Sequence, residues 1–324
     1  MSQFITIRAG AAGFAGLKHL RETLKLSLRA VLHRHATYQW LELLNSHPLF
    51  ADLVKARPRL IYKIYRPYLS NTMDCAQRMQ LLQGHYRHIF RQGLGPLSVQ
   101  AARGAVLLAQ VAGKSGRPYQ LQLRAIEPME REGELVLQLM QDGDLVYSCA
   151  FSFVPGVQGM MLGVGCMQGP RGERGLELIK DATRELHGMR PKNMMVKLLS
   201  QVAHDHGCGQ LRLVGNANRA VRSATRQGKV HADYDALWQE LGAVLRADGD
   251  YQLASEPVCP PDLAAIPSKK RSEARKRHET LQALADAMAA SLRAPRIEAV
   301  PVALAQQYTT VAPGADDGDE YALA

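Results

Sequence analysis

Five strand-like runs, each bounded by turn residues, follow one another in the middle of the chain and limit its fold more than any other feature. They span Gly104–Ala112, Tyr119–Ile126, Glu134–Gln141, Leu145–Val154 and Met160–Gln168. The dipeptide Asp142-Gly143 joins the third run to the fourth and is typical of a two-residue β-hairpin. Leucines alternate with other residues along the second and third runs, which indicates one buried face. The sequence therefore predicts an antiparallel meander that serves as a scaffold.

The first hundred residues are predicted to be helical, and the clearest helix begins near Leu17. Apolar residues recur there every three or four positions, and basic residues form a second stripe beside them. The apolar stripe comprises Leu17, Leu20, Leu24, Leu28 and Val31, and the basic stripe comprises Lys18, Arg21, Lys25 and Arg29. Such a helix can lie on an anionic membrane, but amphipathic helices more often pack on their own domain and show their charges to water. We expect the second arrangement here.

Beyond Gly169 the pattern changes to helices with one short strand between them. Helices are expected at 172–186 and 191–206, a strand at 211–214, a turn at 215–218 and a further helix at 232–241. Pro191 suits the first position of a helix, because no amide partner is needed there. A last helix begins with the basic segment 268–277 and runs towards Leu292.

These patterns predict an α+β protein with a helical region at 1–96, an α+β domain at 97–300 and a disordered, acidic tail at 301–324. The chain carries 40 Lys and Arg against 30 Asp and Glu, and its net charge of +10 favours anionic partners. It has no run of about eighteen apolar residues and no signal-peptide pattern. Its five cysteines lack the spacing of zinc ligands. We therefore expect a cytoplasmic protein without a bound metal.

Two glycine-containing loops that lead into helices are candidates for phosphate binding. Residues 167–172 leave a strand, and residues 187–193 lead into the helix that begins at Pro191. A helix N-terminus offers free amides and the positive end of the helix dipole. In the second loop we expect Arg190 and Lys192 to hold phosphates, and the amides of Asn193 and Met194 to complete the cradle. An ordinary turn is the simpler interpretation, since no Walker motif is present.

The order of strand, phosphate-suited loop, helix, strand and asparagine-containing turn resembles the GNAT superfamily of N-acyltransferases. In that superfamily the loop before the central helix wraps the CoA pyrophosphate, and the gap between two neighbouring parallel strands admits the pantetheine arm. The resemblance implies a loop at 189–193, a central helix at 191–206, a next strand at 211–214 and acyl-CoA as the donor. The chain departs from the superfamily in two respects, because 190–193 lacks the usual loop glycines and the helix at 172–186 intervenes.

Longer motifs resemble the VirK/YbjX family, a bacterial family, over roughly residues 40 to 290. They are His47-Pro48, LHGMRPK at 186–192, VGNAN at 214–218, Trp238 with ELG at 240–242, and IPSKKR at 266–271. Members of this family are linked to virulence and to resistance against cationic antimicrobial peptides, with no agreed reaction. The resemblance therefore implies a bacterial cytoplasmic protein that acts on the envelope.

Three side chains in the second half are candidate acid or base groups. His187 adjoins the phosphate-suited loop, and histidine titrates near neutral pH. Glu240 lies beside Trp238, where burial would raise its pKa and suit it to accept a proton. Tyr234, one turn earlier, is a candidate general acid. The simpler roles are a histidine at a helix end, an exposed glutamate and a packing tyrosine.

These residues support the hypothesis of a GNAT-like transferase that moves an acyl or aminoacyl group from a CoA-like or RNA-like donor to an amine or hydroxyl acceptor. Gln168, Asn216 and Asn218 are candidates to position the acceptor. Asparagines at such places otherwise satisfy a turn.

The basic segment at the start of the last helix supports an alternative of another class. Its basic residues are Lys269, Lys270, Arg271, Arg275, Lys276 and Arg277. A non-catalytic protein would use them, together with the basic N-terminal helix, to bind an anionic membrane surface or RNA. This would place the protein peripherally at the inner membrane. A solvated helix face paired with Glu273 and Glu279 is the simpler account.

Overall fold

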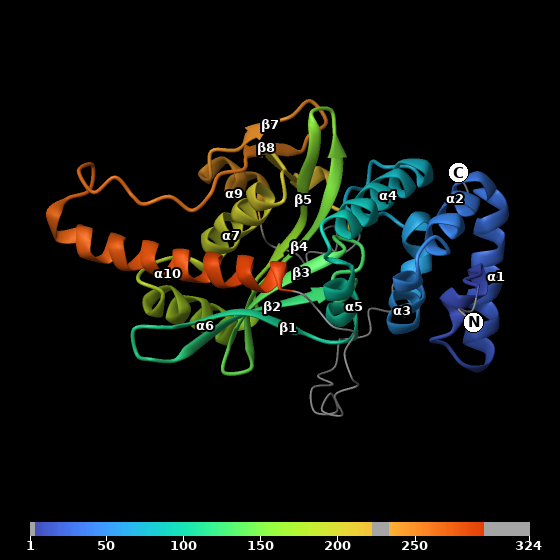
Figure 1. Cartoon of the computed structure of the whole chain (residues 1–324), viewed down its shortest axis with the longest axis horizontal. Helices are drawn as coiled ribbons and strands as arrows, with labels where there is room; N and C mark the ends of the chain where they lie inside the picture. The colour runs from blue at the N-terminus through green and yellow to red at the C-terminus, as the bar shows by residue number, and fades with distance from the viewer. Residues whose placement is uncertain (1–3, 222–232, 295–324) are drawn as a thin grey trace.

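The computed structural model describes residues 4–221 and 233–294, and its first part is a group of helices at one end of the molecule (Figure 1). The elements are the 3-10 helix η1 (Ile7–Ala11), α1 (Gly16–Leu32), α2 (Arg34–Leu44), α3 (Pro48–Ala56), the 3-10 helix η2 (Pro58–Tyr65), α4 (Cys75–Arg91) and α5 (Gly95–Arg103). Asp74 begins α4 with a capping box, in which Gln77 is its partner. The helical character expected for this region is confirmed.

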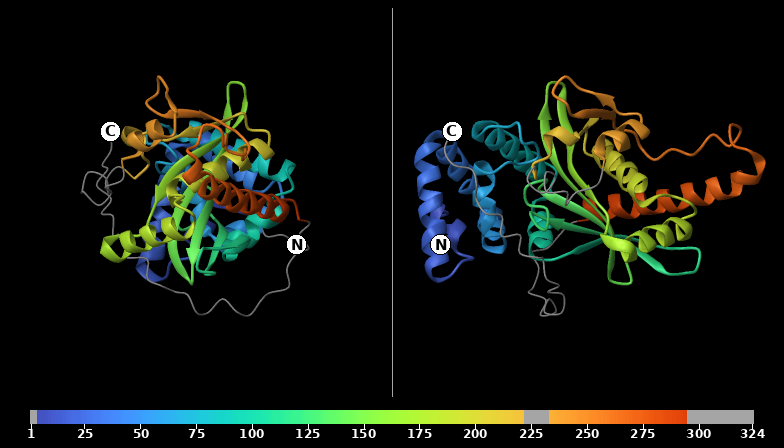
Figure 2. Two further views of the ribbon diagram at one scale, coloured as in Figure 1. Left: turned by 90° about the vertical axis from the view of Figure 1, so that its left-hand side faces the viewer. Right: turned by 180° about the vertical axis from the view of Figure 1, so that it is seen from behind.

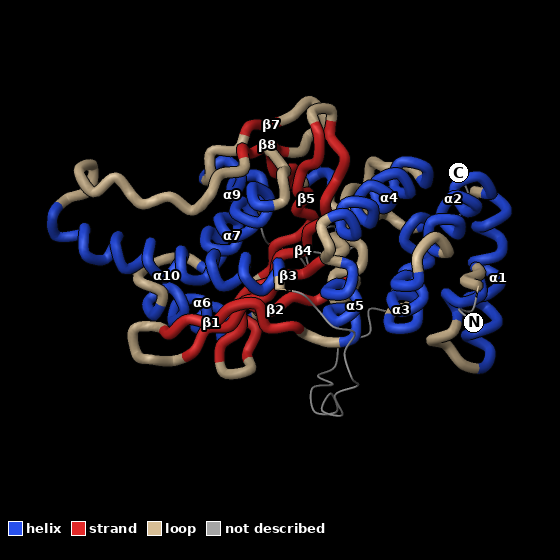
Figure 3. The backbone as a smooth tube through the Cα atoms, in the orientation of Figure 1, coloured by secondary structure: helices blue, strands red, loops and turns tan. Residues whose placement is uncertain are grey.

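An eight-stranded sheet occupies the middle of the molecule (Figure 3). Its strands are β1 (Val106–Ala112), β2 (Pro118–Ala125), β3 (Leu135–Gln141), β4 (Asp144–Gly156), β5 (Gly159–Gln168), β6 (Gln210–Leu213), β7 (Val244–Leu245) and β8 (Tyr251–Ala254). They lie in the order β1-β2-β3-β4-β5-β6-β8-β7. Asp142 and Gly143 have φ angles of 49° and 88°, as their two-residue hairpin requires. The predicted meander of β1 to β5 is confirmed.

The pair of β5 and β6 is parallel, whereas the other neighbouring pairs of the sheet are antiparallel. A parallel pair needs a crossover connection, and here it contains α6 (Gly172–Glu185) and α7 (Pro191–Asp205). The ladder pairs Leu162 with Leu211 and ends where Val164 pairs with Leu213. β5 continues to Gln168 without β6 beside it, so the two strands part at Gly165. This mixed α+β arrangement has the strand–helix–strand order that the GNAT resemblance implies.

The remaining described elements follow β6. They are the 3-10 turn η3 (Asn216–Asn218), α9 (Tyr234–Glu240) and the long helix α10 (Ser268–Arg293). The basic segment therefore does open a long helix. Residue 232 and the tail predicted to be disordered lie outside the described residues. Within residues 4–221 and 233–294, no helix combines the length and the apolar character needed to cross a bilayer.

One apolar core joins the N-terminal helices to the sheet. α4 lies close against β4, since a Cβ added to Gly84 would come within 2.9 Å of Pro155 Cδ. His85 of α4 accepts a hydrogen bond from the amide of Phe153 on β4 (3.1 Å). The helical region predicted at 1–96 and the α+β domain predicted to begin at residue 97 therefore share one core.

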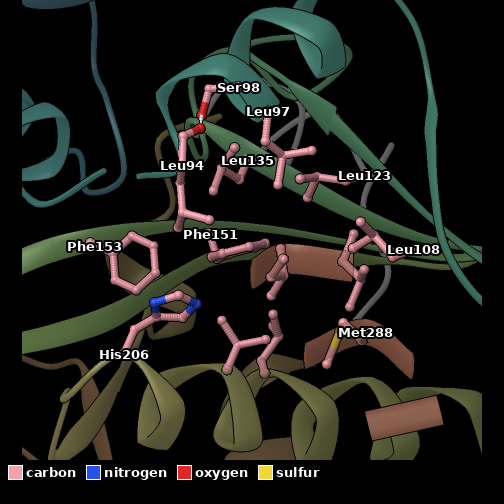
Figure 4. Close-up of a pocket in the computed structure, with 14 residues that line it drawn as sticks. Leu94, Leu97, Ser98, Leu108, Leu123, Leu135, Phe151, Phe153, His206 and Met288 are labelled. Atoms are coloured by element: carbon pink, nitrogen blue, oxygen red, sulfur yellow. Dashed lines mark hydrogen bonds between the residues drawn. The ribbon is translucent and has the colours of Figure 1, made fainter. Parts of the chain in front are cut away.

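The face of the meander that α5, α7 and α10 cover contains a narrow apolar pocket (Figure 4). Its volume is about 20 Å³, which is room for about one water molecule. Leucines, Phe151 and Phe153 form most of its wall, and Ser98 and His206 contribute polar atoms. We interpret this pocket as a packing gap in the core.

The packing of α1 differs from the expectation. The helix forms as predicted, but its apolar stripe points into solvent, with Leu17, Leu20, Leu24, Leu28 and Val31 between 59% and 86% exposed. The expected packing of this stripe on its own domain is therefore wrong. The physical reason is that α1 attaches to the protein through its opposite face, which carries the buried Leu26.

Candidate functional site

The loop between α6 and α7 positions the residues that the sequence indicates for phosphate binding. His187 and Gly188 adopt left-handed backbone conformations, with φ of 56° and 74°, and end α6. Met189 is buried and anchors the loop in the core. Arg190 is the N-cap of α7 and Pro191 is its first residue, as expected.

A cleft of about 440 Å³ lies against this loop, between α7, the end of α9 and α10. Arg190, Lys197 and Arg277 line it as cations, and His278 adds an imidazole. Glu240 supplies an acidic side chain to the same lining. The fold thus brings the loop and the basic segment of α10 together, although the two are far apart in the sequence. A concave site with this balance of charge favours an anion.

Glu240 is the counter-ion of the two cations at the start of α7. Its Oε1 accepts from Arg190 Nη1 and its Oε2 accepts from Lys192 Nζ, each at 2.9 Å. The hydrogen bond from Lys192 lowers the pKa of the Glu240 carboxyl, and the charges of Lys192 and Arg190 lower it further. Glu240 is therefore the exposed glutamate of the simpler interpretation, and its lowered pKa contradicts the role of a buried proton acceptor.

The amides at the start of α7 are already engaged. Those of Asn193 and Met194 both donate to the carbonyl of Arg190, at 3.0 and 3.1 Å. They are not free to cradle a phosphate, which corrects the expectation for this pair. Asn193 Oδ1 has no hydrogen-bond partner in the part of the chain that the structure describes. The cleft therefore offers an anion its cationic side chains and not the amides of these two residues.

His187 connects the loop to α10 and keeps a neutral ring. Its carbonyl accepts from Arg277 Nε at 3.1 Å. Partial burial lowers the pKa of the imidazole, and the charges of Lys114 and Lys276 lower it further. Nδ1 of the ring has no partner among residues 4–221 and 233–294. This nitrogen is buried, and His187 lies beside the cleft without forming part of its lining.

A second groove continues from this cleft along α7 towards the sheet. Its volume is about 760 Å³, and residues of α7, β6, β8 and the segment 256–259 line it. Lys197, Cys259 and Leu281 line both hollows, so the two are contiguous. Together they form an elongated site with a cationic end at Arg190. Such a shape suits an extended ligand that carries its negative charge at one end.

Tyr234 occupies the place where β5 loses its neighbour. The amide of Met167 donates to the Tyr234 hydroxyl at 2.8 Å, and this hydroxyl lies 3.0 Å from the Met167 carbonyl and 3.2 Å from Cys166 Sγ. The Arg219 guanidinium covers the ring at 3.6 Å from its centroid. Burial raises the pKa of Tyr234 well above its usual value, and Cys166 adds to this. Tyr234 is therefore a poor general acid, and it satisfies the backbone in the gap between the parallel strands.

The sequence did not point to Glu132, a second titratable group beside the gap between β5 and β6. It belongs to the loop between β2 and β3, which folds back over β5 so closely that a Cβ on Gly165 would lie 2.0 Å from the Glu132 carbonyl oxygen. Desolvation raises the pKa of its carboxyl, which hydrogen-bonds with Cys166. The glycines at 163 and 165 inside a strand were the available signal, since glycine in a strand often marks a close backbone approach.

The three residues expected to position an acceptor have different surroundings. Asn216 Nδ2 donates to Asp233 Oδ1 (2.7 Å), and its Oδ1 accepts from Arg219 Nη2 (2.7 Å). Asn218 Nδ2 donates to Asp250 Oδ1 (2.8 Å) in a buried position. Both asparagines thus satisfy the turn after β6. Gln168 is exposed at the end of β5, in contrast to the two asparagines.

The basic segment of α10 divides between the cleft and the solvent. Arg277 is partly buried at the cleft, whereas the rest of the segment is exposed, namely Lys269, Lys270, Arg271, Arg275 and Lys276. Glu273 pairs with Lys114 at 3.5 Å. No group of three or more histidine, cysteine or acidic side chains within residues 4–221 and 233–294 is arranged to hold a metal ion.

Comparisons with protein families and relatives extend over most of the chain. The family model described as "Protein of unknown function (DUF535)" matches residues 15–290. The chain is 28% identical over 300 residues to "Uncharacterized protein YbjX" of Escherichia coli (strain K12), which is 90% of each chain. It is 27% identical over 174 residues to "Membrane protein LapB" of Mannheimia haemolytica, which is 53% of this chain and 73% of that one.

Among solved structures, the chain is similar to a cAMP-binding acyltransferase from Mycobacterium smegmatis with 12% identity and a TM-score of 0.27. The match covers 66% of this chain and 62% of that one, so it spans less than two thirds of that protein.

Proposed function

This chain belongs to the DUF535 family, as the VirK/YbjX motifs indicated, and from that premise we propose that it is an acyltransferase whose donor is an acyl-CoA or a similar phosphorylated carrier. The observation that carries the proposal is the cationic cleft at the start of α7, beside a sheet in which two parallel strands part. We propose an amine or a hydroxyl of the bacterial envelope as the acceptor, as the resemblance to the VirK/YbjX family implies.

The donor phosphates would bind Arg190, Lys197 and Arg277, and the rest of the donor would follow the groove along α7. Because Glu240 now neutralises Arg190 and Lys192, an incoming phosphate must displace its carboxylate. Glu240 thereby fixes the side chains of Arg190 and Lys192, and it weakens the binding of anions that make few other contacts.

Two groups are suited to accept the proton of the acceptor at neutral pH. The lowered pKa of His187 keeps its ring neutral, and the raised pKa of Glu132 makes its carboxylate a stronger base. Glu132 lies beside the gap that Tyr234 fills, and α9, which begins at Tyr234, spans about 10 Å to Glu240 at the cleft. Gln168, at the end of β5, would contact the acceptor.

The proposed location is the cytoplasm, at the inner surface of the inner membrane. The name "Membrane protein LapB" of the relative from Mannheimia haemolytica supports a search for the acceptor at a membrane. The alternative is a protein without catalytic activity that binds membrane or RNA through the exposed cations of α10, and it predicts binding that weakens steeply with salt.

Calorimetric titration of CoA, acetyl-CoA and longer acyl-CoAs into the full chain tests the donor assignment. We expect the double variant Arg190→Ala/Arg277→Ala to lose binding and Glu240→Gln to bind more tightly than the wild type. Arg174→Ala is the matched control, because Arg174 is an exposed arginine of α6 that pairs with Asp144 and does not line the cleft. No heat with any CoA, or equal affinity of the wild type and the double variant, would remove the donor from this cleft.

A further inference from the structure

The outer face of α1 is an apolar stripe with no partner among the described residues. Leu17, Leu20, Leu24, Leu28 and Val31 form it, and each is more than half exposed. Figure 1 and the right-hand view of Figure 2 both place α1 at the extreme end of the molecule. A contiguous apolar face of this length on a protein surface marks an interaction site.

The opposite face of α1 holds the helix firmly, so the stripe is presented in a fixed orientation. Leu26 is buried against η1 and η2, where a Cβ on Gly10 would meet Leu26 Cδ1 at 2.9 Å and Ile61 at 3.2 Å. Glu22 accepts a hydrogen bond from the Tyr62 hydroxyl at 3.3 Å. Rotation of α1 to bury its stripe would break these contacts.

A row of cations borders the stripe on one side. It consists of Lys18, Arg21, Lys25 and Arg29, and Glu22 is the single acidic residue of α1. Glu22 is turned inward, with 13% of its side chain exposed. Arg21 Nη2 and Lys25 Nζ lie 3.5 and 3.6 Å from Glu22 Oε1, so this inward-turned carboxylate offsets part of the charge of the row. The outer half of the helix is therefore apolar along its centre and carries a net positive charge along its edge. An isologous contact between antiparallel copies of α1 would bring two such cation rows to the same edge, whereas an anionic bilayer offers both hydrocarbon and phosphate.

We propose that α1 is a membrane-docking helix that lies in the surface of an anionic lipid bilayer. The apolar stripe inserts between the lipid headgroups, and the cation row contacts the phosphates. The inference does not depend on the proposed acyl transfer, because it concerns a surface that shares no residue with the α7 cleft.

Cosedimentation of the full chain with vesicles tests this surface in the absence of CoA. We expect binding to vesicles of phosphatidylglycerol and phosphatidylethanolamine, and weak binding to phosphatidylcholine alone. Leu20→Asp/Leu24→Asp should weaken the binding by at least about a hundredfold, because each buried leucine contributes about 1.5–3 kcal/mol. Lys18→Gln/Arg21→Gln should weaken it by about thirtyfold, since each surface cation contributes about 1 kcal/mol.

The matched control is Val157→Asp/Leu176→Asp, which places the same charges on exposed apolar residues of the turn between β4 and β5 and of α6. It should bind vesicles as the wild type does, and circular dichroism should show that all variants are folded. Absence of binding to anionic vesicles at low salt would overturn the proposal. So would a wild-type dimer that Leu20→Asp/Leu24→Asp converts to a monomer, or binding to RNA that persists in this variant while vesicles are not bound.

Discussion

The buried ion pair between Lys63 and Glu134 connects the N-terminal helices to the sheet. We expect its disruption to lower the free energy of unfolding strongly. Lys63 Nζ donates to Glu134, and the exposed fractions of the two side chains are 3% and 1%. The Tyr86 hydroxyl donates to the other carboxylate oxygen of Glu134. Lys63 comes from η2, Tyr86 from α4, and Glu134 from the residue before β3, so one carboxylate connects three parts of the core.

Replacing Lys63 with methionine keeps the side-chain volume and removes its charge. Glu134 would then be a buried carboxylate that keeps the hydrogen bond from the Tyr86 hydroxyl but has lost its counter-ion. Breaking a buried pair in this way costs about 3–5 kcal/mol of unfolding free energy. The double variant Lys63→Met/Glu134→Leu removes both charges, so we expect it to be more stable than Lys63→Met. Denaturant unfolding at pH 7, followed by circular dichroism, measures the three free energies.

The pH dependence gives an independent check with a definite sign. Burial alone would raise the pKa of Glu134, but the charges of Lys63 and His85 and the hydrogen bonds from Lys63 and Tyr86 outweigh it, so the pKa is lowered. A carboxyl with a lowered pKa in the folded state contributes stability above its unfolded pKa, and this contribution is lost as the pH falls. In Lys63→Met the pKa of Glu134 should instead be raised, so lowering the pH should reduce the cost of the substitution. A cost that is independent of pH, or a double variant that is no more stable than Lys63→Met, would refute this reasoning.

Two further predictions concern buried polar groups. Tyr234→Phe should lower the free energy of unfolding by about 1–3 kcal/mol, because the amide of Met167 loses its acceptor at the buried end of β5. Denaturant unfolding measures this change. A value below about 0.5 kcal/mol would show that the Met167 amide finds another partner. Burial lowers the pKa of His85 to about 3, so the unfolded state binds the proton first and wild-type stability should fall below about pH 6.5. His85→Gln can still accept the hydrogen bond from the Phe153 amide, and its stability should depend less on pH below about 6.5 in the same assay. An unchanged slope of the free energy of unfolding against pH would exclude His85 as the origin of this dependence.

Local patterns were sufficient to predict most elements of this fold. The hairpin at Asp142-Gly143, the helix that begins at Pro191 and the short strand at Leu211 each have a signal within a few residues. The sequence also placed the cationic loop correctly at the start of α7. These features depend on backbone preference and periodicity, which a short window contains.

Long-range contacts decided the features that the sequence did not predict. The sequence left open whether Glu240 is buried beside Trp238 or exposed, and its pairing with Arg190, which lies fifty residues earlier in the chain, decides against a role as a buried base. Glu132 acquires its raised pKa because a loop folds over Gly165. In α1 the periodicity identified the apolar stripe, but it could not show that the helix attaches through Leu26 on the other side.

The positions of the two proposed sites restrict how they can work together. α1 lies at one end of the molecule, and α10, whose residues 274–281 line the α7 cleft, begins at the other end (Figures 1 and 2). A bilayer that contacts the outer face of α1 therefore leaves the cleft open to the aqueous phase. A soluble phosphorylated donor can reach it there, whereas a lipid donor of the same bilayer cannot reach it without leaving the membrane. Vesicle binding and CoA binding should consequently be independent, and mutual exclusion of the two ligands would show that one of the sites has been assigned to the wrong face.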